Sequence, residues 1–369
     1  MMNYKTNHDK PEMMPTLLLD KQKCLTNIER MAHKAHHNQL TFRPHFKTHQ
    51  SAEIGSWFRD FGVSGITVSS FRMARYFAAA GWKDILVAFP FNPQDIRQLN
   101  ELSKSARISI LLDNPDALSF LTSLEQSTPF YVDIDTGYGR TGIKSENRDE
   151  IERLLSAARD IPRLHFSGFY CHAGHSYKSS DLDRRWTIHE KSMRDLGSLK
   201  SQFKHLEPLA LYGDTPNCST QCDFNGIDEL TPGNFIFYDL TQVMLGSCSP
   251  NDVAVAMACP VSGTYPDRKQ LVIHGGGIHF SKESLQMGNN LVFGQVVSDS
   301  GKGWSIPGEK NYITSLSQEH GVLEQCGTLF DQTRIGDTLL LMPVHSCMCA
   351  NLMRDYQTLE GKVINSINS

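Results

Sequence analysis

The stretch LTFRPHFKTHQ, from Leu40 to Gln50, reads as a short strand that runs into a polar turn containing Lys47. Basic side chains flank this lysine in the sequence at Arg43, His45 and His49. Neighbouring cations destabilise an ammonium group, so they lower the pKa of a lysine and make its neutral amine accessible. A positioned neutral amine is what Schiff-base chemistry with a carbonyl compound requires. A basic surface turn would have the same local pattern, so the rest of the chain has to decide between the two interpretations.

This strand is the first of eight strand-like runs that alternate with longer helical patterns, among them Arg72–Ala80 and Asp181–Phe203. Asn114-Pro115-Asp116 has the capping residue and the early proline that are typical of a helix start. Eight strands accompanied by helices predict parallel pairing and a closed (β/α)8 TIM barrel of the α/β class. A doubly wound open sheet is the alternative, but no Gly-x-Gly-x-x-Gly follows the first strand. The predicted strands are residues 40–47, 65–70, 84–90, 106–113, 129–136, 165–172, 208–214 and 229–239.

The pattern changes after about residue 253, where short β-type runs are separated by Gly, Pro, Asp and Ser without long helical patterns. We therefore expect a barrel over residues 20–252 and a C-terminal all-β domain over residues 253–369. The early run Thr16–Asp20 could join either domain, so residues 1–19 are a candidate addition to the β domain. The predicted strands of this domain are residues 253–262, 270–274, 292–297, 312–317 and 338–343.

The composition excludes several classes of protein. The chain has 369 residues, a formal net charge of −4 and 40% hydrophobic residues, which is typical of a soluble globular protein of about two domains. No apolar run reaches membrane-spanning length, and a charge this near neutral gives no case for a nucleic-acid partner. The polar segment Met1–Glu12 lacks the apolar stretch of a secretory signal and is expected to be a loose arm.

Nine cysteines are scattered through the chain without paired spacing, which favours reduced thiols in a cytoplasmic protein. Cys24, Cys171, Cys248 and Cys259 stand in apolar or mixed surroundings and are expected to be buried packing residues.

In such a barrel the active site forms at the C-terminal ends of the strands, and the first strand ends at Lys47. Arg140 follows a Gly-Tyr-Gly turn after the fifth strand, where a guanidinium can hold a phenolate or a carboxylate. His172 ends the sixth strand and could pack against an aromatic ring. The turns Gly213–Ser219 and Gly233–Asn234 combine glycine with Thr, Ser or Asn on neighbouring strands, as phosphate-binding turns do. Ordinary barrel loops use the same residue types, so this interpretation stays open.

A second candidate site lies in the segment PVHSCMCANL, residues 343–352. In an extended chain, residues two positions apart face the same side, so His345 and Cys347 point together and could share one metal ion. Imidazole and thiolate together suit zinc best among common divalent metals, and two protein ligands leave positions open for water or substrate. A buried strand end with an incidental histidine and a free thiol is the alternative. Cys349 could be a third thiol near this metal, although an unliganded thiol fits better.

Taken together, several segments occur in an order that resembles a known family. They are Arg43-Pro-His-Phe-Lys-Thr-His49, Gly65–Val68, Asp84–Pro90, Asp133-Ile-Asp-Thr-Gly-Tyr-Gly-Arg-Thr-Gly142 and His345-Ser-Cys347. The chain resembles the D-serine dehydratase and D-threonine aldolase group of alanine-racemase-like (fold-type III) pyridoxal-phosphate enzymes, from about residue 14 to about residue 360.

The resemblance implies a role for each of these residues. The lysine that binds pyridoxal 5'-phosphate falls on Lys47, and the residue near the phenolic oxygen of the cofactor falls on Arg140. The catalytic metal ligands fall on His345 and Cys347. The ring-facing pair falls on Tyr170 and His172, and the phosphate-binding loops fall on Thr215, Ser219, Gly233 and Asn234. The resemblance also implies a homodimer with active sites near the subunit interface.

The chain departs from the family pattern at several positions, and these departures limit which reactions are expected. Alanine racemases place an arginine against the pyridine nitrogen where this chain has Thr231, and no second tyrosine base is evident, so a racemase is disfavoured. Aldolase members have Asp where Cys347 stands, so the His-x-Cys pair favours the dehydratases. The run His274-Gly-Gly-Gly-Ile-His279 differs from the usual Asp-Ala-Gly run, and His279 is a candidate residue on the substrate side.

We therefore expect a lyase that acts on a small D-3-hydroxyamino acid such as D-serine and eliminates water to give an oxo acid and ammonia. Retro-aldol cleavage to glycine and an aldehyde, as in D-threonine aldolase, is the alternative. A non-catalytic pyridoxal-phosphate carrier is a third hypothesis, but small carriers of that kind lack a β domain.

Overall fold

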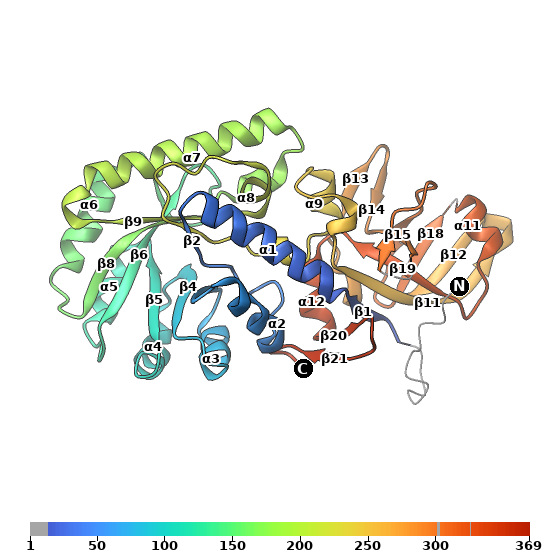
Figure 1. Cartoon of the computed structure of the whole chain (residues 1–369), viewed down its shortest axis with the longest axis horizontal. Helices are drawn as coiled ribbons and strands as arrows, with labels where there is room; N and C mark the ends of the chain where they lie inside the picture. The colour runs from blue at the N-terminus through green and yellow to red at the C-terminus, as the bar shows by residue number, and fades with distance from the viewer. Residues whose placement is uncertain (1–13, 301–302, 325) are drawn as a thin grey trace. The chain divides into compact units, whose positions relative to one another are not determined.

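The computed structural model describes residues 14–300, 303–324 and 326–369 (Figure 1). The expected loose arm, Met1–Glu12, lies outside these residues. The chain forms two compact units. The barrel unit consists of Ile28–Lys47 and Ile54–Phe235, and the β unit consists of residues up to Asn27, Thr48–Glu53 and Ile236–Ser369.

The barrel unit is a parallel sheet in which the described strands follow the order β2-β10-β9-β8-β6-β5-β4-β3. The strands are β2 (Thr41–Phe42), β3 (Gly65–Val68), β4 (Asp84–Pro90), β5 (Arg107–Leu112), β6 (Thr128–Asp135), β8 (Leu164–Cys171), β9 (Leu209–Tyr212) and β10 (Glu229–Leu230). A short strand β7 (Ile143–Lys144) pairs with β6 beside this path. The predicted parallel α/β barrel is therefore confirmed.

The barrel closes through backbone bonds beyond the end of β2. His45 forms a parallel bridge with Thr67 of β3. The Thr67 N–H donates to Pro44 O at 2.9 Å, and the Phe46 N–H donates to Thr67 O at 2.8 Å. These bonds join the first and last strands of the sheet path and fix the backbone up to the residue before Lys47.

Helices follow the strands around the barrel, as the blue to green elements of Figure 1 show. They are α3 (Phe71–Ala79), α4 (Ile96–Leu102), α5 (Leu118–Leu121), α6 (Arg148–Ala158), α7 (Leu182–Gln202) and α8 (Thr215–Thr220); α1 (Lys21–His37) and α2 (Ala52–Trp57) each have residues in both units. Side-chain caps start several of them. Asp181 accepts from the Asp183 N–H at 2.9 Å at the start of α7, and Asn114 begins the short turn before α5, as predicted.

The interior of the barrel is filled by large side chains that the strands point inward. Leu86, Leu111, Tyr131, Tyr170 and Leu211 pack together there, and each is at most 5% exposed. The strands read as nearly continuous buried runs because helices cover their outer side and their inner side meets this core.

The β unit is built on a largely antiparallel sheet with the order β12-β18-β17-β15-β19-β11-β1-β20-β21. The strands are β1 (Thr16–Leu19), β11 (Val255–Tyr265), β12 (Gln270–His274), β15 (Gly294–Asp299), β17 (Tyr312–Leu316), β18 (His320–Glu324), β19 (Thr338–Pro343), β20 (Asp355–Thr358) and β21 (Val363–Asn365). β16 (Trp304–Ser305) pairs with β15, and β13 (Leu285–Met287) pairs with β14 (Asn290–Val292). The early run Thr16–Asp20, which the sequence alone did not assign to a domain, contains β1, and this strand pairs with β11 and β20.

The structure corrects three expectations about local structure. The eighth barrel strand ends at Leu230 rather than at residue 239, and Asn234–Ile236 form a 3-10 turn. The first strand is regular only at Thr41–Phe42, because proline at position 44 cannot donate a hydrogen bond to a neighbouring strand. The β unit is not purely β, since it contains the short helices α9 (Leu240–Met244), α10 (Gly277–Phe280), α11 (Gly327–Gln332) and α12 (Ser346–Met353).

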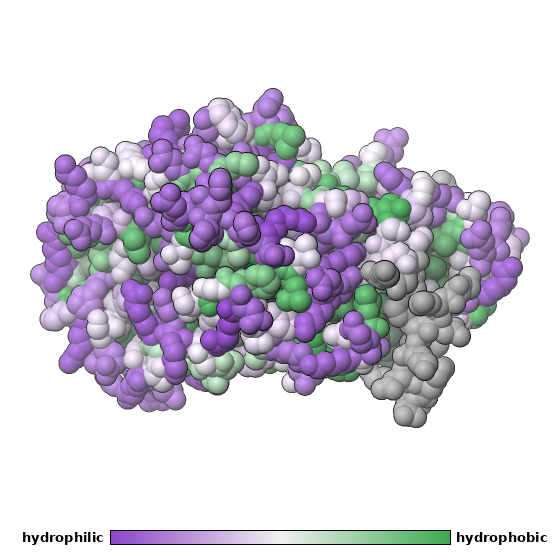
Figure 2. Space-filling view, in the orientation of Figure 1, coloured by the Kyte–Doolittle hydropathy of each residue, from purple (hydrophilic) through white to green (hydrophobic). Residues whose placement is uncertain are grey.

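Among the described residues no helix is both long enough and apolar enough to span a membrane. Figure 2 shows a face on which hydrophilic residues predominate and hydrophobic ones form small, scattered patches. None of the nine cysteines forms a disulfide, and Cys24, Cys171 and Cys259 are buried as predicted, whereas Cys248 is only partly buried.

Gly168 in β8 provides a test of the barrel packing. It has φ +148°, and a Cβ added there would lie 1.9 Å from Leu209 O of the neighbouring strand. We expect Gly168→Ala to lower the free energy of unfolding by at least about 3 kcal/mol, because β8 and β9 would have to separate.

Gly197 in α7 is the matched control, since an added Cβ there meets no atom within 4 Å among the described residues. Gly197→Ala should raise stability by about 0.5–1 kcal/mol. Urea unfolding measures both, and equal stability of Gly168→Ala and the parent would contradict the strand contact.

Candidate active site

Lys47 lies at the C-terminal end of the first barrel strand, immediately after the closing bonds to β3, and its side chain is half-buried. Its backbone N–H donates to His45 Nδ1 at 3.3 Å. The Phe46 ring beside it is fully buried and packs against Phe58 and Trp82, with ring centroids 4.9 and 5.2 Å away. The backbone around the lysine is thus held rigidly at the mouth of the barrel unit.

The neighbours of Lys47 differ from those that the sequence suggested. Arg43 is buried in ion pairs with Glu229 and Asp84, the latter at 2.8 Å, so two carboxylates balance its charge. Burial lowers the pKa of His49 to about 3, so this imidazole is neutral. The expectation that Arg43 and His49 act as unbalanced cations beside the lysine is therefore wrong. Ion pairing and burial depend on residues that are distant in sequence.

The charged neighbourhood of Lys47 is formed instead by the loops of other strands. Burial, together with the charges of Lys47 and Arg140, lowers the pKa of His172 to about 3. His172 Nδ1 lies 2.7 Å from Gly213 O. Because a carbonyl oxygen only accepts, Nδ1 carries the proton and Nε2 has a free lone pair. The charges of Lys47 and Arg140 therefore act on a neutral His172.

The loop that carries Arg140 is organised by a carboxylate at the end of β6. Asp135 accepts from the Gly137 N–H at 2.8 Å and from the Gly139 N–H at 3.1 Å. The exposed Arg140 guanidinium lies 5.0 Å from the Tyr138 ring centroid, and this ring in turn contacts His172 with centroids 5.8 Å apart. The Tyr138 ring thus contacts both Arg140 and His172.

Tyr170 lies deeper than the sequence suggested. It belongs to the packed interior of the barrel and is 5% exposed. Burial, with the nearby Asp133, raises the pKa of its phenol, so the hydroxyl stays protonated. The resemblance placed both Tyr170 and His172 against the cofactor ring. His172 lies at the end of the strand, whereas Tyr170 packs in the interior of the barrel.

The candidate phosphate turns have different structures. Thr215 is the first residue of α8, and its buried Oγ1 has no hydrogen-bond partner among the described residues. The Thr215 N–H donates to the Tyr177 hydroxyl at 3.2 Å, and the Asp214 carboxylate caps the helix by accepting from the Asn217 N–H. Ser219 lies one turn further along α8, away from the helix start. Gly213 packs so closely that a Cβ there would lie 2.1 Å from Thr231 Oγ1. Thr215 Oγ1 is thus a buried group that fits an anionic oxygen.

Gly233 and Asn234 follow β10, where Asn234 begins a 3-10 turn and is 5% exposed. Parallel strands β9 and β10 pair directly, with Tyr212 opposite Leu230. The two glycine-containing turns therefore follow neighbouring strands at the same end of the barrel, as the sequence predicted.

The second candidate site lies in the β unit at the start of α12. His345 precedes this helix with extended backbone, and Cys347 is already in its first turn. The expectation of a continuous extended chain through Cys347 is therefore wrong, because Asp239 caps the helix by accepting from the Ser346 N–H at 3.0 Å and from its hydroxyl at 3.2 Å. The two side chains nevertheless lie together: burial lowers the pKa of His345, but the hydrogen bonds that its ring makes to Cys347 and Glu283 outweigh this effect and raise the pKa to about 11.

Three residues around this pair were missed by sequence reasoning. Glu283 Oε2 lies 3.0 Å from His345 Nδ1, and Thr48 Oγ1 lies 3.3 Å from Cys347 Sγ. The buried Asp239 holds the helix start. Thr48 directly follows Lys47 in the sequence, which is a signal that could have been noticed. Nothing local marks Glu283, which is 62 positions away from His345.

Cys349 is not part of this pair. It is fully buried, and its thiol donates to Phe280 O at 3.5 Å. Burial, with Asp239 nearby, raises the pKa of this thiol well above its usual range. The structure therefore favours the unliganded thiol over a third metal ligand.

His279, the other open candidate, lies in a separate cluster with His274 and Glu319. Glu319 Oε2 is 3.3 Å from His274 Nε2 and 4.0 Å from His279 Nε2. Two imidazoles and a carboxylate resemble a metal site, but His279 Nδ1 accepts from the Gly276 N–H at 3.1 Å. Nε2 of the neutral ring then carries the proton and cannot bind a metal. The contacts are those of a hydrogen-bonded cluster.

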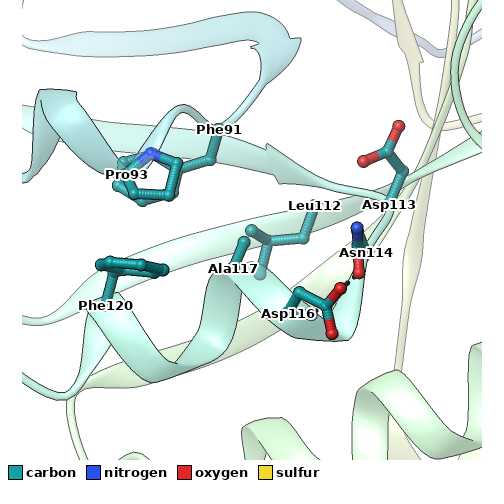
Figure 3. Close-up of a pocket in the computed structure, with 8 residues that line it drawn as sticks. All are labelled: Phe91, Pro93, Leu112, Asp113, Asn114, Asp116, Ala117 and Phe120. Atoms are coloured by element: carbon teal, nitrogen blue, oxygen red, sulfur yellow. Dashed lines mark hydrogen bonds between the residues drawn. The ribbon is translucent and has the colours of Figure 1, made fainter.

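A hollow of about 240 Å³ at the ends of β4 and β5 contains none of the predicted site residues. Figure 3 shows apolar walls from Phe91, Pro93 and Phe120, with Asp113 set apart from them. Asp113 accepts from the Gly142 N–H at 3.1 Å, so it supports the loop that carries Arg140.

The architecture and both residue groups define a class: a parallel α/β barrel with a lysine at its mouth and a β unit with an imidazole–thiol pair. The chain belongs to the alanine-racemase-like proteins, since the family model "Alanine racemase, N-terminal domain" matches residues 19–236, and "Putative serine dehydratase domain" matches residues 254–359.

Individual relatives cover nearly the whole chain. A D-serine dehydratase from Dictyostelium discoideum is 27% identical over 95% of both chains. A D-threonine aldolase from Arthrobacter sp. is 24% identical over 96% of this chain and 90% of its own. The solved structure of D-threo-3-hydroxyaspartate dehydratase from Delftia sp. HT23 has a TM-score of 0.89 at 22% identity and covers 97% of this chain and 98% of its own. Two variants of that dehydratase, a cysteine-to-alanine form described as metal-free and a histidine-to-alanine form, have the same TM-score.

The titration of His172 gives a testable pH dependence. Its pKa is about 3 in the fold and about 6.5 in an unfolded chain, so its neutral form contributes stability that is fully present above pH 6.5 and is lost as pH falls toward 3. Between about pH 7 and about pH 4, the free energy of unfolding of the cofactor-free parent should fall by about 2–3 kcal/mol more than that of His172→Asn, whose amide can still donate to Gly213 O.

His165→Asn, at an exposed position of the same strand, is the matched control and should follow the parent. Denaturant titrations across this pH range measure the difference. Parallel curves for the parent and His172→Asn would show that His172 is not held neutral by the fold.

Proposed function

We propose that this chain is a pyridoxal-phosphate- and metal-dependent lyase acting on D-3-hydroxyamino acids, with β-elimination of the D-serine dehydratase type as its reaction. The observation that carries the proposal is the joint presence of Lys47 with Arg140 and neutral His172 in the barrel unit and of the His345–Cys347 pair in the β unit. The family match supports it over both units.

The cofactor assignment rests on the groups at the barrel mouth. Lys47 would bind the cofactor aldehyde covalently, and the unpartnered Thr215 Oγ1 fits one of its phosphate oxygens. Gly233 and Asn234 would contribute to the same phosphate contact, with Ser219 at its periphery. His172 and Arg140 would face the ring and its phenolic oxygen, with Tyr170 supporting His172 from the core. When bound, pyridoxal phosphate supplies a ring that accepts the electron pair left by the Cα proton.

The remaining proposed roles, proton removal and metal binding, belong to side chains of the protein. The Lys47 amine, once released from the cofactor, is the proposed base that removes the Cα proton. His172 stays neutral above pH 3, so it adds no second positive charge beside this amine. His345 and Cys347 would hold a divalent metal, with zinc favoured by imidazole and thiolate donors. That metal would stabilise the hydroxyl oxygen as the Cβ–O bond breaks.

We propose residues 20–252 as the cofactor-binding domain and residues 253–369, joined by residues 1–19, as the second domain. The pairing of β1 with β11 and β20 supports the last assignment. A homodimer is proposed from the family resemblance. A cytoplasmic location is proposed from the nine free cysteines, which persist as thiols in a reducing compartment.

The D-threonine aldolase reaction remains the second candidate, because a relative with that name matches 96% of the chain. Racemization has less support, since Thr231 stands where racemases have arginine, and its Oγ1 is packed against Gly213.

The lysine assignment predicts a loss of cofactor binding. Lys47→Ala should lack the visible absorbance band of protein-bound cofactor and should lose D-serine turnover by at least about a thousandfold, because both the covalent link and the base are removed. Lys144→Ala, at an exposed position of β7, is the control and should keep both. Turnover that survives in Lys47→Ala would overturn the proposed function.

The metal assignment predicts a dependence on divalent cations. Dialysis against a chelator should abolish turnover of D-serine, and zinc should restore it, because hydroxide is a poor leaving group without a metal. His345→Ala should resemble the chelated protein and should not recover with zinc. Full activity after chelation would contradict the metal role.

A single substrate separates the two lyase reactions. D-threonine should give a four-carbon oxo acid and ammonia if the Cβ–O bond breaks, whereas glycine and a two-carbon aldehyde indicate cleavage of the Cα–Cβ bond. Mass spectrometry of the products decides between them, and we expect the oxo acid.

A further inference from the structure

Glu283 reaches His345 from a segment whose shape is unusual. This segment begins at His274, the last residue of β12, passes through Gly275–Gly277 and α10, and ends at Glu283 before β13. Glu283 Oε2 lies 3.0 Å from His345 Nδ1, although the Glu283 side chain is 53% exposed. An exposed glutamate would normally be free to sample many rotamers, so the contact needs an explanation in the backbone.

The backbone of the segment supplies that explanation. Gly276 lies so close to the neighbouring strand connection that a Cβ would meet Gln318 O at 2.3 Å, and only glycine fits. After α10 the chain turns sharply at the buried Ser281, which has φ +68°, a conformation that non-glycine residues rarely adopt. Ser281 Oγ then accepts from the Glu283 N–H at 3.2 Å. The glycine run and this strained turn together direct Glu283 toward α12.

The hydrogen bond determines which nitrogen of His345 is available. A carboxylate only accepts, so Nδ1 of the ring carries a proton that it donates to Glu283. A metal would therefore bind Nε2, in place of the second proton that the ring carries while its pKa is raised. Carboxylates that hold a ligating histidine in this way fix its tautomer and raise its basicity toward the metal. The other side of the pair is held independently, since Asp239 caps α12 and Thr48 contacts Cys347.

We infer that Glu283 is a positioning residue that holds His345 in the tautomer and orientation needed for metal binding, and that the His274–Glu283 segment exists to place it. The inference rests on the metal site of the proposed function. It also gives a role to the glycine run that distinguishes this chain from the Asp-Ala-Gly pattern noted above.

The test is the affinity of the full-length protein for Co²⁺, followed by the visible absorbance of a cobalt–thiolate site and by competition with a chelating dye. Glu283→Ala should weaken Co²⁺ binding by about 10- to 100-fold, the usual cost of losing such an outer partner. Glu283→Gln keeps an oxygen that accepts from Nδ1 and should recover most of the affinity. The absorbance spectrum and the rescue by glutamine report on the ligand directly, and a general loss of structure would not produce this pattern.

Glu324→Ala is the matched control, because Glu324 is an exposed glutamate of the same unit that accepts from Gln270 Nε2 at 3.1 Å and lies outside the His274–Glu283 segment. It should bind Co²⁺ as the parent does. The inference is overturned if Glu283→Ala binds Co²⁺ within twofold of the parent, or if Glu324→Ala weakens binding equally. If the parent and His345→Ala both fail to bind Co²⁺, the metal site itself fails and this inference with it, which separates the two outcomes.

Discussion

The closure of the barrel at Thr67 is the constraint on which the rest of the barrel site depends. Thr67 bonds to Pro44 on one side and to Phe46 on the other, so β3 holds the chain immediately before Lys47. The Phe46 ring is locked among aromatic side chains, and Gly55 makes room for it, since a Cβ there would lie 3.0 Å from the ring. A long, flexible side chain is thus attached to a backbone that hydrogen bonds and ring packing hold in place, as the proposed covalent cofactor link would require.

Burial decides the charges around that lysine. Arg43 is a basic residue close to Lys47 in the sequence, but its side chain is buried in the barrel, where it pairs with Glu229 and Asp84. Removing both carboxylates would leave the buried guanidinium without a charged partner, which is costly. His49 and His172 are both neutral because burial disfavours their charged forms. Arg140 and Lys47, which the loops after β6 and β2 supply, are charged groups that help to lower the pKa of His172.

The β unit shows a different balance between local and distant structure. The His-x-Cys spacing predicted a shared position for the two side chains, and they do lie together, but through a helix start rather than an extended strand. The cap that makes the helix begin there comes from Asp239, 107 residues earlier in the chain. Glu283, which bonds to the histidine, comes from another distant segment. Local periodicity contains no information about either partner, so sequence reasoning could not have found them.

The sequence by itself determined the alternation of strands and helices and the change to β structure after about residue 253. It also determined which residue types stand at the strand ends. These features follow from local periodicity, turn residues and the parallel order of the strands. It did not determine where the eighth strand stops, that Tyr170 faces the core, or that the basic residues near Lys47 are paired or neutral. Only the tertiary structure decided these points. Burial, ion pairing and helix capping bring together residues that are far apart in the chain, and their energies depend on those partners rather than on neighbours in sequence.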